Sequence, residues 1–269
     1  MTENQTLPVV LVFAGSDPTG GAGIQADIES LASMGCHAAP VITAITIQDT
    51  QNVKGYFPLD MATITEQARV VLEDMPIAAI KIGMLGSLDA IEAINSIVID
   101  YPDIPVIFDP VLAAGGGAAL ADQEMIEAIC RLIIPYTTIL VPNSVEARSL
   151  AREADVLEAC AHELMDLGAE YVLITGSHEQ TSKVENLFYG NNRLMDSFSW
   201  ERLPATYHGS GCTLAACLAG LIAHGIDPLS AAHEAQEFTW KSLQAGNRLG
   251  MGQLIPNRFF WAQQEEPEE

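Results

Sequence analysis

The amino-acid sequence predicts an α/β fold, with a mostly parallel sheet and helices on both faces. Short, continuous apolar runs alternate with longer stretches whose apolar residues recur at helical spacing. Strands that are apolar throughout are typical of parallel sheets covered on both faces. Because no linker-like break interrupts the alternation, we expect one domain over residues 8–261. A flexible start at 1–7 and an acidic, disordered tail at 262–269 flank it.

The strands are expected at short apolar runs bounded by turn residues. The first, from Pro8 to Ala14, ends at a glycine-rich loop over residues 15–23. Five similar runs follow, and then a hairpin whose two segments flank Gly190. In chain order the expected strands cover residues 8–14, 40–47, 79–82, 105–108, 138–141, 171–174, 185–189 and 194–200.

The helices are expected where apolar residues align on one side. After the first loop, Ile24, Ile28 and Leu31 share a face, and this helix stops at Gly35. The run 214–223 is apolar on nearly every side, which predicts a buried helix. In chain order the expected helices cover residues 24–34, 63–75, 88–99, 122–133, 144–152, 155–167, 214–223 and 228–246.

Composition limits the class of partner. The chain has 269 residues and a net charge of −23, with only 12 Lys and Arg, so no nucleic-acid partner is expected. No apolar run reaches the roughly 18 residues of a membrane span, and the N-terminus lacks a secretory signal pattern. The 5 cysteines are odd in number and form no C-x-x-C pattern, which favours a reducing cytoplasm over a disulfide framework or a zinc site.

A polar, glycine-rich turn over residues 207–213 leads into the apolar helix 214–223. Glycines just before a helix let backbone N–H groups converge on an anion, and the helix dipole adds attraction. A cysteine at this place, here Cys212, can have a lowered pKa. The turn by itself leaves two interpretations open, a phosphate-binding turn with a reactive thiol or an ordinary helix start with a small buried cysteine.

Polar groups lie at or near the ends of most predicted strands. They are expected on one rim, because ligands of open α/β sheets bind beyond the carboxyl ends of the strands. In chain order they are Gly15, Asp17, Gln48, Asp49, Lys81, Gly83, Met84, Asp109, Asn143, Glu146, Thr175 and Gly176.

Asp27 falls inside the apolar arc of its predicted helix, between Ile24 and Leu31. A carboxylate in this place is either buried and paired or serves a ligand. A third interpretation is an acidic residue early in the helix that favours the helix dipole.

Asn143 and Glu146 open another helix directly after a strand. Asn143 suits an N-cap and Glu146 its reciprocal partner, which needs no function. The functional interpretation places Glu146 on a Mg²⁺-bound water, because Mg²⁺ prefers few carboxylates and several waters. Asp109 is expected to help in the same way.

Residues 21–26 match the dinucleotide pattern G-x-G-x-x-A. The glycines begin six residues after the predicted strand ends, whereas the fingerprint requires a tight turn. A dinucleotide enzyme therefore stays open as a weaker alternative that predicts NAD binding. The P-loop pattern G-x-x-x-x-G-K-[ST] does not occur in the chain.

Five segments together resemble the hydroxymethylpyrimidine/phosphomethylpyrimidine kinases, of the ribokinase-like superfamily. They are Ala14 to Asp27, Lys81 to Leu85, Asp109 to Val111, Pro142 to Ala147 and His208 to Thr213. The resemblance covers about residues 8–250. It implies a three-layer αβα sandwich, a homodimer and a kinase that needs ATP and Mg²⁺. The implied reaction phosphorylates 4-amino-5-hydroxymethyl-2-methylpyrimidine and then its monophosphate, giving the pyrophosphate in thiamine biosynthesis.

The resemblance also implies roles for residues of this chain. Cys212 removes or orients the proton of the accepting oxygen, where most ribokinase-like enzymes have Asp. The N–H groups of Gly209, Ser210 and Gly211 cradle the transferring phosphoryl group. The remaining assignments are Gly15, Asp27, Gln48, Met84 and Val111 to the pyrimidine, Asn143, Thr175 and Asp109 to ATP, and Asp109 and Glu146 to the metal.

This chain departs from the family pattern in places. Thr175 to His178 read Thr-Gly-Ser-His where the family often has Lys-Gly-Gly-His, so a lysine for the ATP phosphates is missing. Asp49 replaces Asn and Ser210 replaces Thr. Two alternatives stay open: a pyridoxal kinase, and a non-catalytic pyrimidine-binding regulator that kept the fold.

Overall fold

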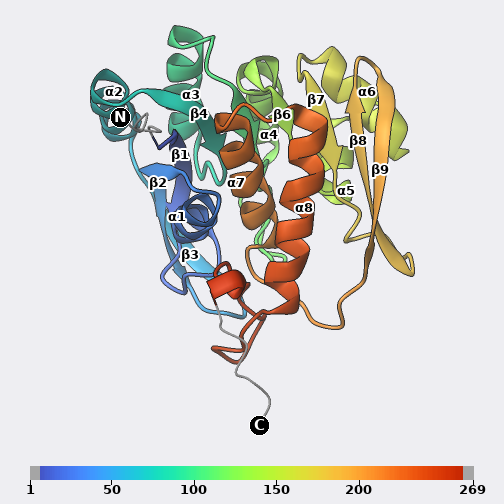
Figure 1. Cartoon of the computed structure of the whole chain (residues 1–269). Coiled ribbons are helices and arrows are strands. Elements are labelled where there is room, and N and C mark those ends of the chain that lie inside the picture. Colours follow the sequence, from blue (N-terminus) through green and yellow to red (C-terminus); the bar gives the residue numbers. More distant parts are fainter. Residues whose placement is uncertain (1–6, 263–269) are drawn as a thin grey trace, which may run out of the picture.

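One nine-stranded sheet organises residues 7–262, which are those that the computed structural model describes (Figure 1). Its spatial order is β3-β2-β1-β4-β5-β6-β7-β8-β9. From β2 to β7 in this order the strands pair in parallel, whereas β3, β8 and β9 pair antiparallel. The strands are β1 (Val9–Ser16), β2 (His37–Gln48), β3 (Val53–Pro58), β4 (Ile77–Ile82), β5 (Val106–Phe108), β6 (Ile139–Leu140), β7 (Tyr171–Ile174), β8 (Lys183–Gly190) and β9 (Arg193–Glu201).

Helices cover both faces of the sheet, which makes three layers (Figure 1). They are α1 (Gly23–Ser33), α2 (Met61–Asp74), α3 (Leu88–Asp100), α4 (Gln123–Leu132), α5 (Ser144–Leu150), α6 (Leu157–Asp166), α7 (Ser210–Ala223) and α8 (Pro228–Gln244). On one face residues of α1, α7 and α8 share a core with Val10 and Val12 of β1, and on the other α2 to α6 share a core with Leu11 and Phe13. Alternate residues of a strand point to opposite faces, so β1 feeds both cores. The predicted α/β class and the implied three layers are confirmed.

The chain order changes direction at β1. It passes from β1 to β2 on one side and later returns to β4 on the other side. Such a reversal leaves a crevice at the carboxyl ends of the two strands, where open α/β sheets bind ligands. Gly15 lies next to the last residue of β1 on this rim, and Met84 follows β4 there.

The sequence did not predict β3. Its residues include Gly55, Pro58 and the exposed Phe57, so they form no buried apolar run. The strand exists because β2 continues to Gln48 and offers an edge for antiparallel pairing. The buried helix also begins earlier than predicted, at Ser210, so Cys212 lies in the first turn of α7.

The predicted flexible ends fall outside the described residues, apart from residues 7 and 262. None of the helices within 7–262 is both long enough and apolar enough to cross a bilayer.

Candidate active site

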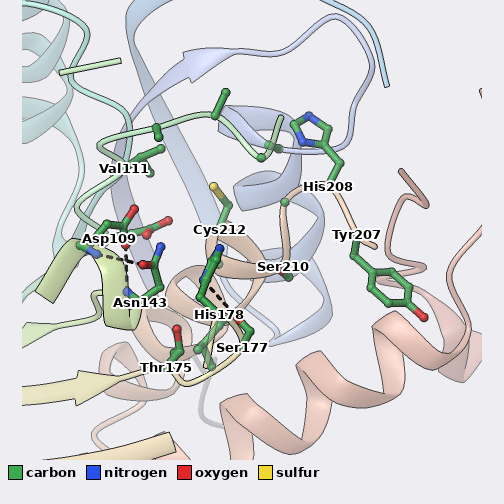
Figure 2. Close-up of a pocket in the computed structure, with 18 of the residues that line it drawn as sticks. Asp109, Val111, Asn143, Thr175, Ser177, His178, Tyr207, His208, Ser210 and Cys212 are labelled. Atoms are coloured by element: carbon green, nitrogen blue, oxygen red, sulfur yellow. Dashed lines mark hydrogen bonds between the residues drawn. The ribbon is translucent and has the colours of Figure 1, made fainter. Parts of the chain in front are cut away.

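A cavity of about 1100 Å³ opens at the carboxyl ends of the parallel strands. Figure 2 shows side chains that follow β5 and β7, or lie at the starts of α5 and α7, lining a pocket. Among the residues predicted for the site, only Asp27 is absent from the cavity wall. Those that line it are Gly15, Gln48, Met84, Asp109, Val111, Asn143, Glu146, Thr175, Gly209, Ser210, Gly211 and Cys212.

The turn before α7 is shaped to hold an anion. Gly209 has a left-handed backbone, with φ of 83°, and a Cβ there would overlap the carbonyl oxygen of Gly21. Thr213 N–H bonds to Gly209 O, so the N–H groups of Ser210, Gly211 and Cys212 precede the first bond of the helix ladder. These free donors and the dipole of a 14-residue helix attract negative charge to the cavity wall.

Asp17 ties the loop after β1 to this turn. Its carboxylate accepts bonds of 2.8 Å from Thr19 N and Ala22 N and lies 2.9 Å from His208 Nε2. Burial alone would raise the pKa of Asp17, but the hydrogen bonds from His208 and the loop backbone bring it below its usual value. The two segments of the family signature, 191 residues apart, are therefore joined directly.

Arg258 holds the same two segments from behind, and sequence reasoning missed it. Its buried guanidinium donates to the carbonyl oxygens of Gly20 and Gly21 and to Thr213 Oγ1. It also pairs with Glu29 at 3.0 Å. No motif surrounds Arg258 in the sequence, so only its burial in the folded chain reveals this role.

The glycines of residues 21–26 have a structural explanation other than a dinucleotide. A Cβ on Gly21 would overlap the His208 ring, and one on Gly23 would overlap the carbonyl oxygen of Gly15. The pattern therefore reflects close packing of this loop against the turn before α7 and the end of β1.

Cys212 lies half-buried at the centre of the cavity wall (Figure 2). The pKa of its thiol is raised to about 12, chiefly by burial; Lys81 opposes this rise, and Asp109 and Asp27 add to it. The lowered pKa that a helix N-terminus can produce is not found, because burial and the two carboxylates outweigh Lys81 and the backbone N–H of Gly23. The thiol is therefore protonated at neutral pH.

Asp109 and Glu146 are two acidic side chains that interact in the same cavity wall as Cys212. Burial raises the pKa of both, and Asp109 adds to that of Glu146, which reaches about 8. Asp109 Oδ2 is buried and has no hydrogen-bond partner among the described residues. Such a pair suits a cation, although no group of three or more acidic, His or Cys side chains within 7–262 could hold one.

The cap that Asn143 and Glu146 were predicted to form is present. Asn143 Oδ1 accepts from Val145 N and Glu146 N, and Glu146 Oε2 accepts from Asn143 N at 2.9 Å. Glu146 Oε1 is 3.4 Å from Leu112 N. The cap fixes the carboxylate at the cavity wall, and its metal role stays a prediction.

The prediction that Asp27 contacts the pyrimidine is not supported. Asp27 is 0% exposed, lies off the cavity wall and pairs with Lys81 at 2.9 Å. Its place inside the apolar arc of α1 therefore reflects a buried ion pair, which was the structural interpretation of the sequence pattern.

The two ends of the cavity differ in character. Near the β1–β4 crevice, Gly15 packs closely against Met84, since a Cβ there would lie only 3.1 Å from Met84 Sδ. At the other end the wall contains Thr175, Trp200 and Arg202. The Thr175 backbone is committed to Pro142 and Ser144, so only its side chain is free to contact a ligand.

The chain matches the family model described as phosphomethylpyrimidine kinase over residues 17–257. A hydroxymethylpyrimidine/phosphomethylpyrimidine kinase from Haemophilus influenzae is 35% identical over 263 residues, which cover 94% of this chain and 96% of the relative.

Two solved structures are also similar. The phosphomethylpyrimidine kinase of Clostridium difficile superposes with a TM-score of 0.75 at 29% identity, covering 87% of this chain and 97% of the other. The pyridoxal kinase of Staphylococcus aureus in complex with AMP-PCP gives 0.86 at 26% identity, covering 95% and 94%.

Proposed function

The chain belongs to the phosphomethylpyrimidine kinase family, and we propose that it transfers phosphoryl groups from ATP to a pyrimidine of thiamine biosynthesis. The acceptors are 4-amino-5-hydroxymethyl-2-methylpyrimidine and then its monophosphate. The observation that carries this proposal is a single cavity in which the anion-binding turn of α7 lies between two differently built ends.

We assign the acceptor to the end formed by Gly15, Gln48, Met84 and Val111. Gln48 offers both a donor and an acceptor, which suits the edge of an aminopyrimidine. Met84 and Val111 supply apolar surface for the ring, and the absence of a side chain at Gly15 lets Met84 pack closely beside it. The nucleotide occupies the opposite end, beside Asn143 and Thr175.

Phosphoryl transfer depends chiefly on positioning and charge stabilisation. The N–H groups of Ser210, Gly211 and Cys212 are directed at the negative charge of the transferring group. The protonated Cys212 thiol orients the accepting oxygen rather than removing its proton beforehand. In the second step the acceptor is a phosphate oxygen that is already anionic, so that step needs no base.

Asp109 and Glu146 suit Mg²⁺, because Asp109 Oδ2 lacks a hydrogen-bond partner within residues 7–262 and the two groups repel each other when both are ionised. Mg²⁺ would be held there partly through waters and would neutralise charge on the ATP phosphates. The cap of α5 holds Glu146 in place, and Asp109 is held by its position directly after β5.

A pyridoxal-type substrate is the second candidate. The specific observation is the superposition on the Staphylococcus aureus pyridoxal kinase across nearly the whole chain. Both substrates are heterocycles that carry a hydroxymethyl group, so turnover of each by the same preparation separates the candidates.

We propose a homodimer formed through the outer face of β2 and β3. Ile45 and Ile47 are both 50% exposed there, and Phe57 is 64% exposed. Thr46 and Gln48, which alternate with these isoleucines along β2, line the cavity on the opposite face. A Phe57→Ser variant that sediments like the wild type would contradict this interface.

The five free cysteines and the use of ATP are consistent with a cytoplasmic enzyme.

A coupled assay with ATP and either the pyrimidine alcohol or its monophosphate tests the proposed function. Cys212→Ala is expected to lower kcat by about tenfold for both acceptors, because a positioning contact is lost in both. A loss of 10²-fold or more that is confined to the alcohol would instead assign Cys212 the role of base. Absence of phosphoryl transfer by the wild type would refute the proposal.

A further inference from the structure

Two ionised side chains lie buried behind the cavity wall and take no part in the chemistry described above. Lys81 on β4 and Asp27 on α1 are both 0% exposed. Lys81 Nζ lies 2.9 Å and 3.1 Å from the two carboxylate oxygens of Asp27. Well-packed apolar residues commonly give equal or greater stability than such a pair. Stability therefore does not account for a lysine in a central strand.

The ammonium group of Lys81 is turned toward the catalytic end of the sheet. A Cβ on Gly83 would lie 2.6 Å from Nζ, so the side chain runs along its own strand toward the carboxyl end. Lys81 pairs with Ile107 of β5, and Asp109 follows two residues later on the same side. A Cβ on Gly211 would lie 3.7 Å from Asp109 Oδ1, which puts the first turn of α7 beside that carboxylate.

The cavity wall carries little positive charge of its own. Among the described residues of its wall, four carboxylates accompany one arginine, Arg202, whose guanidinium donates to three backbone carbonyls. The whole chain carries a charge of −23. A cation enclosed in a low-dielectric interior acts over a greater distance than one at the surface, because water and salt screen it less.

Lys81 is charged in this environment. Burial alone would lower its pKa, but the neighbouring groups Asp27, Cys212 and Asp109 raise it. Besides raising the pKa of Lys81, Asp27 holds the ammonium group in one position through its two contacts with Nζ.

We propose that Lys81, held by Asp27, is a positioning residue that presents the positive end of a buried ion pair behind the α7 turn during phosphoryl transfer. It acts through the electric field on Asp109 and on the phosphoryl group, without contacting the nucleotide. The inference rests on the proposed kinase function and adds a residue to that site.

The test compares Lys81→Met with the double variant Asp27→Leu/Lys81→Met. The single change leaves a buried carboxylate without its partner, so it is expected to lower both the melting temperature and kcat. The double change replaces the pair by apolar residues of similar size, so the melting temperature is expected to return to the wild-type value or exceed it. Turnover of the double variant is expected to stay about 10²-fold below wild type, with the KM for the pyrimidine alcohol within about threefold.

A double variant with wild-type kcat would overturn the inference, because the pair would then serve only folding. Should the double variant not fold, the kcat of Lys81→Met is compared with that of Ile94→Ala, which truncates a core residue on the opposite face of the sheet. Both are measured below the two melting temperatures. Equal kcat for the two would equally overturn it.

Binding of ADP with aluminium fluoride, a mimic of the transferring phosphoryl group, separates this inference from the choice of acceptor. The double variant is expected to bind the mimic about 10²-fold more weakly than wild type does, with ADP alone bound equally by both. Equal binding of the mimic would refute the role of Lys81. Wild-type enzyme that binds the mimic but does not phosphorylate the pyrimidine would refute only the proposed substrate.

Discussion

The same strands contribute side chains to both faces of the sheet, but the two faces bury different kinds of residue. Beneath α2 to α6 the core is aliphatic and aromatic, as at Phe13 and Ile94, although Glu146 of α5 is buried at the cavity wall. Beneath α1, α7 and α8 the interior also contains the charged side chains of Asp27, Lys81 and Arg258, all nearly or wholly inaccessible to solvent.

This difference indicates that the apolar residues of one face chiefly stabilise the fold, whereas the buried charges of the other face position the site. Each buried apolar side chain of the first face contributes roughly 1.5–3 kcal/mol by leaving water. Buried charges on the second face are stable only in fixed pairs, and each pair fixes part of the site. Arg258 holds the loop after β1 and the turn before α7, the two catalytic segments, and Lys81 lies behind the anion-binding turn. Three changes test this division, from the largest expected effect to the smallest.

Gly209→Ala is expected to have the largest effect on activity. The new Cβ would collide with the Gly21 carbonyl, and φ of 83° disfavours any L side chain, so the turn must move. Displaced N–H donors are expected to reduce kcat by about 10³-fold, equivalent to about 4 kcal/mol of transition-state stabilisation.

Gly225→Ala is the matched control for this change. Its φ of +79° imposes the same backbone strain, but a Cβ there meets nothing within 4 Å. It is expected to lower the melting temperature while kcat stays at the wild-type value. Equal kcat losses in both variants would show that strain, rather than the geometry of the turn, is responsible.

Ile94→Ala tests the aliphatic face. Ile94 is fully buried on α3, so truncation is expected to cost about 2–5 kcal/mol of unfolding free energy. Turnover below the melting temperature is expected to be unchanged, because no charge or cavity residue moves. Urea unfolding and steady-state kinetics measure the two effects separately, and a parallel fall in kcat would contradict the proposed division.

The pH dependence of stability tests the acidic pair. Burial and Asp109 raise the pKa of Glu146 from 4.5 to about 8, so the folded protein binds a proton that the unfolded chain has released. Its stabilising contribution is complete below pH 4.5 and is lost as the pH rises to about 8, by up to about 1.4 kcal/mol per pH unit.

Glu146→Gln is expected to remove this slope while keeping the cap, because Gln also suits that position. Saturating Mg²⁺ is expected to flatten the wild-type slope by favouring the ionised carboxylate. Urea unfolding at pH 5 to 8 measures both effects. A slope identical in wild type and variant would show that Glu146 is ionised throughout.

Much of the fold and most of the cavity wall could be predicted because the signals are local. Apolar runs located eight of the nine strands of residues 7–262, and strand-end polar residues located the rim. The strand β3 was not predicted, because an exposed antiparallel edge strand depends on pairing with its neighbour rather than on its own sequence pattern. Asp27 was assigned to the pyrimidine through the family resemblance, and no local pattern indicates its pairing partner, Lys81, which lies 54 residues away.

The sequence by itself determined the α/β class, the glycine-rich turn before α7 and the set of residues at the strand ends. These features follow from hydrophobic periodicity and from backbone conformations that only certain residues adopt. Only the tertiary structure decided which charges are paired, that Arg258 and His208 hold the two catalytic segments together, and that the Cys212 thiol is protonated. Those properties depend on burial and on distances between residues far apart in the chain.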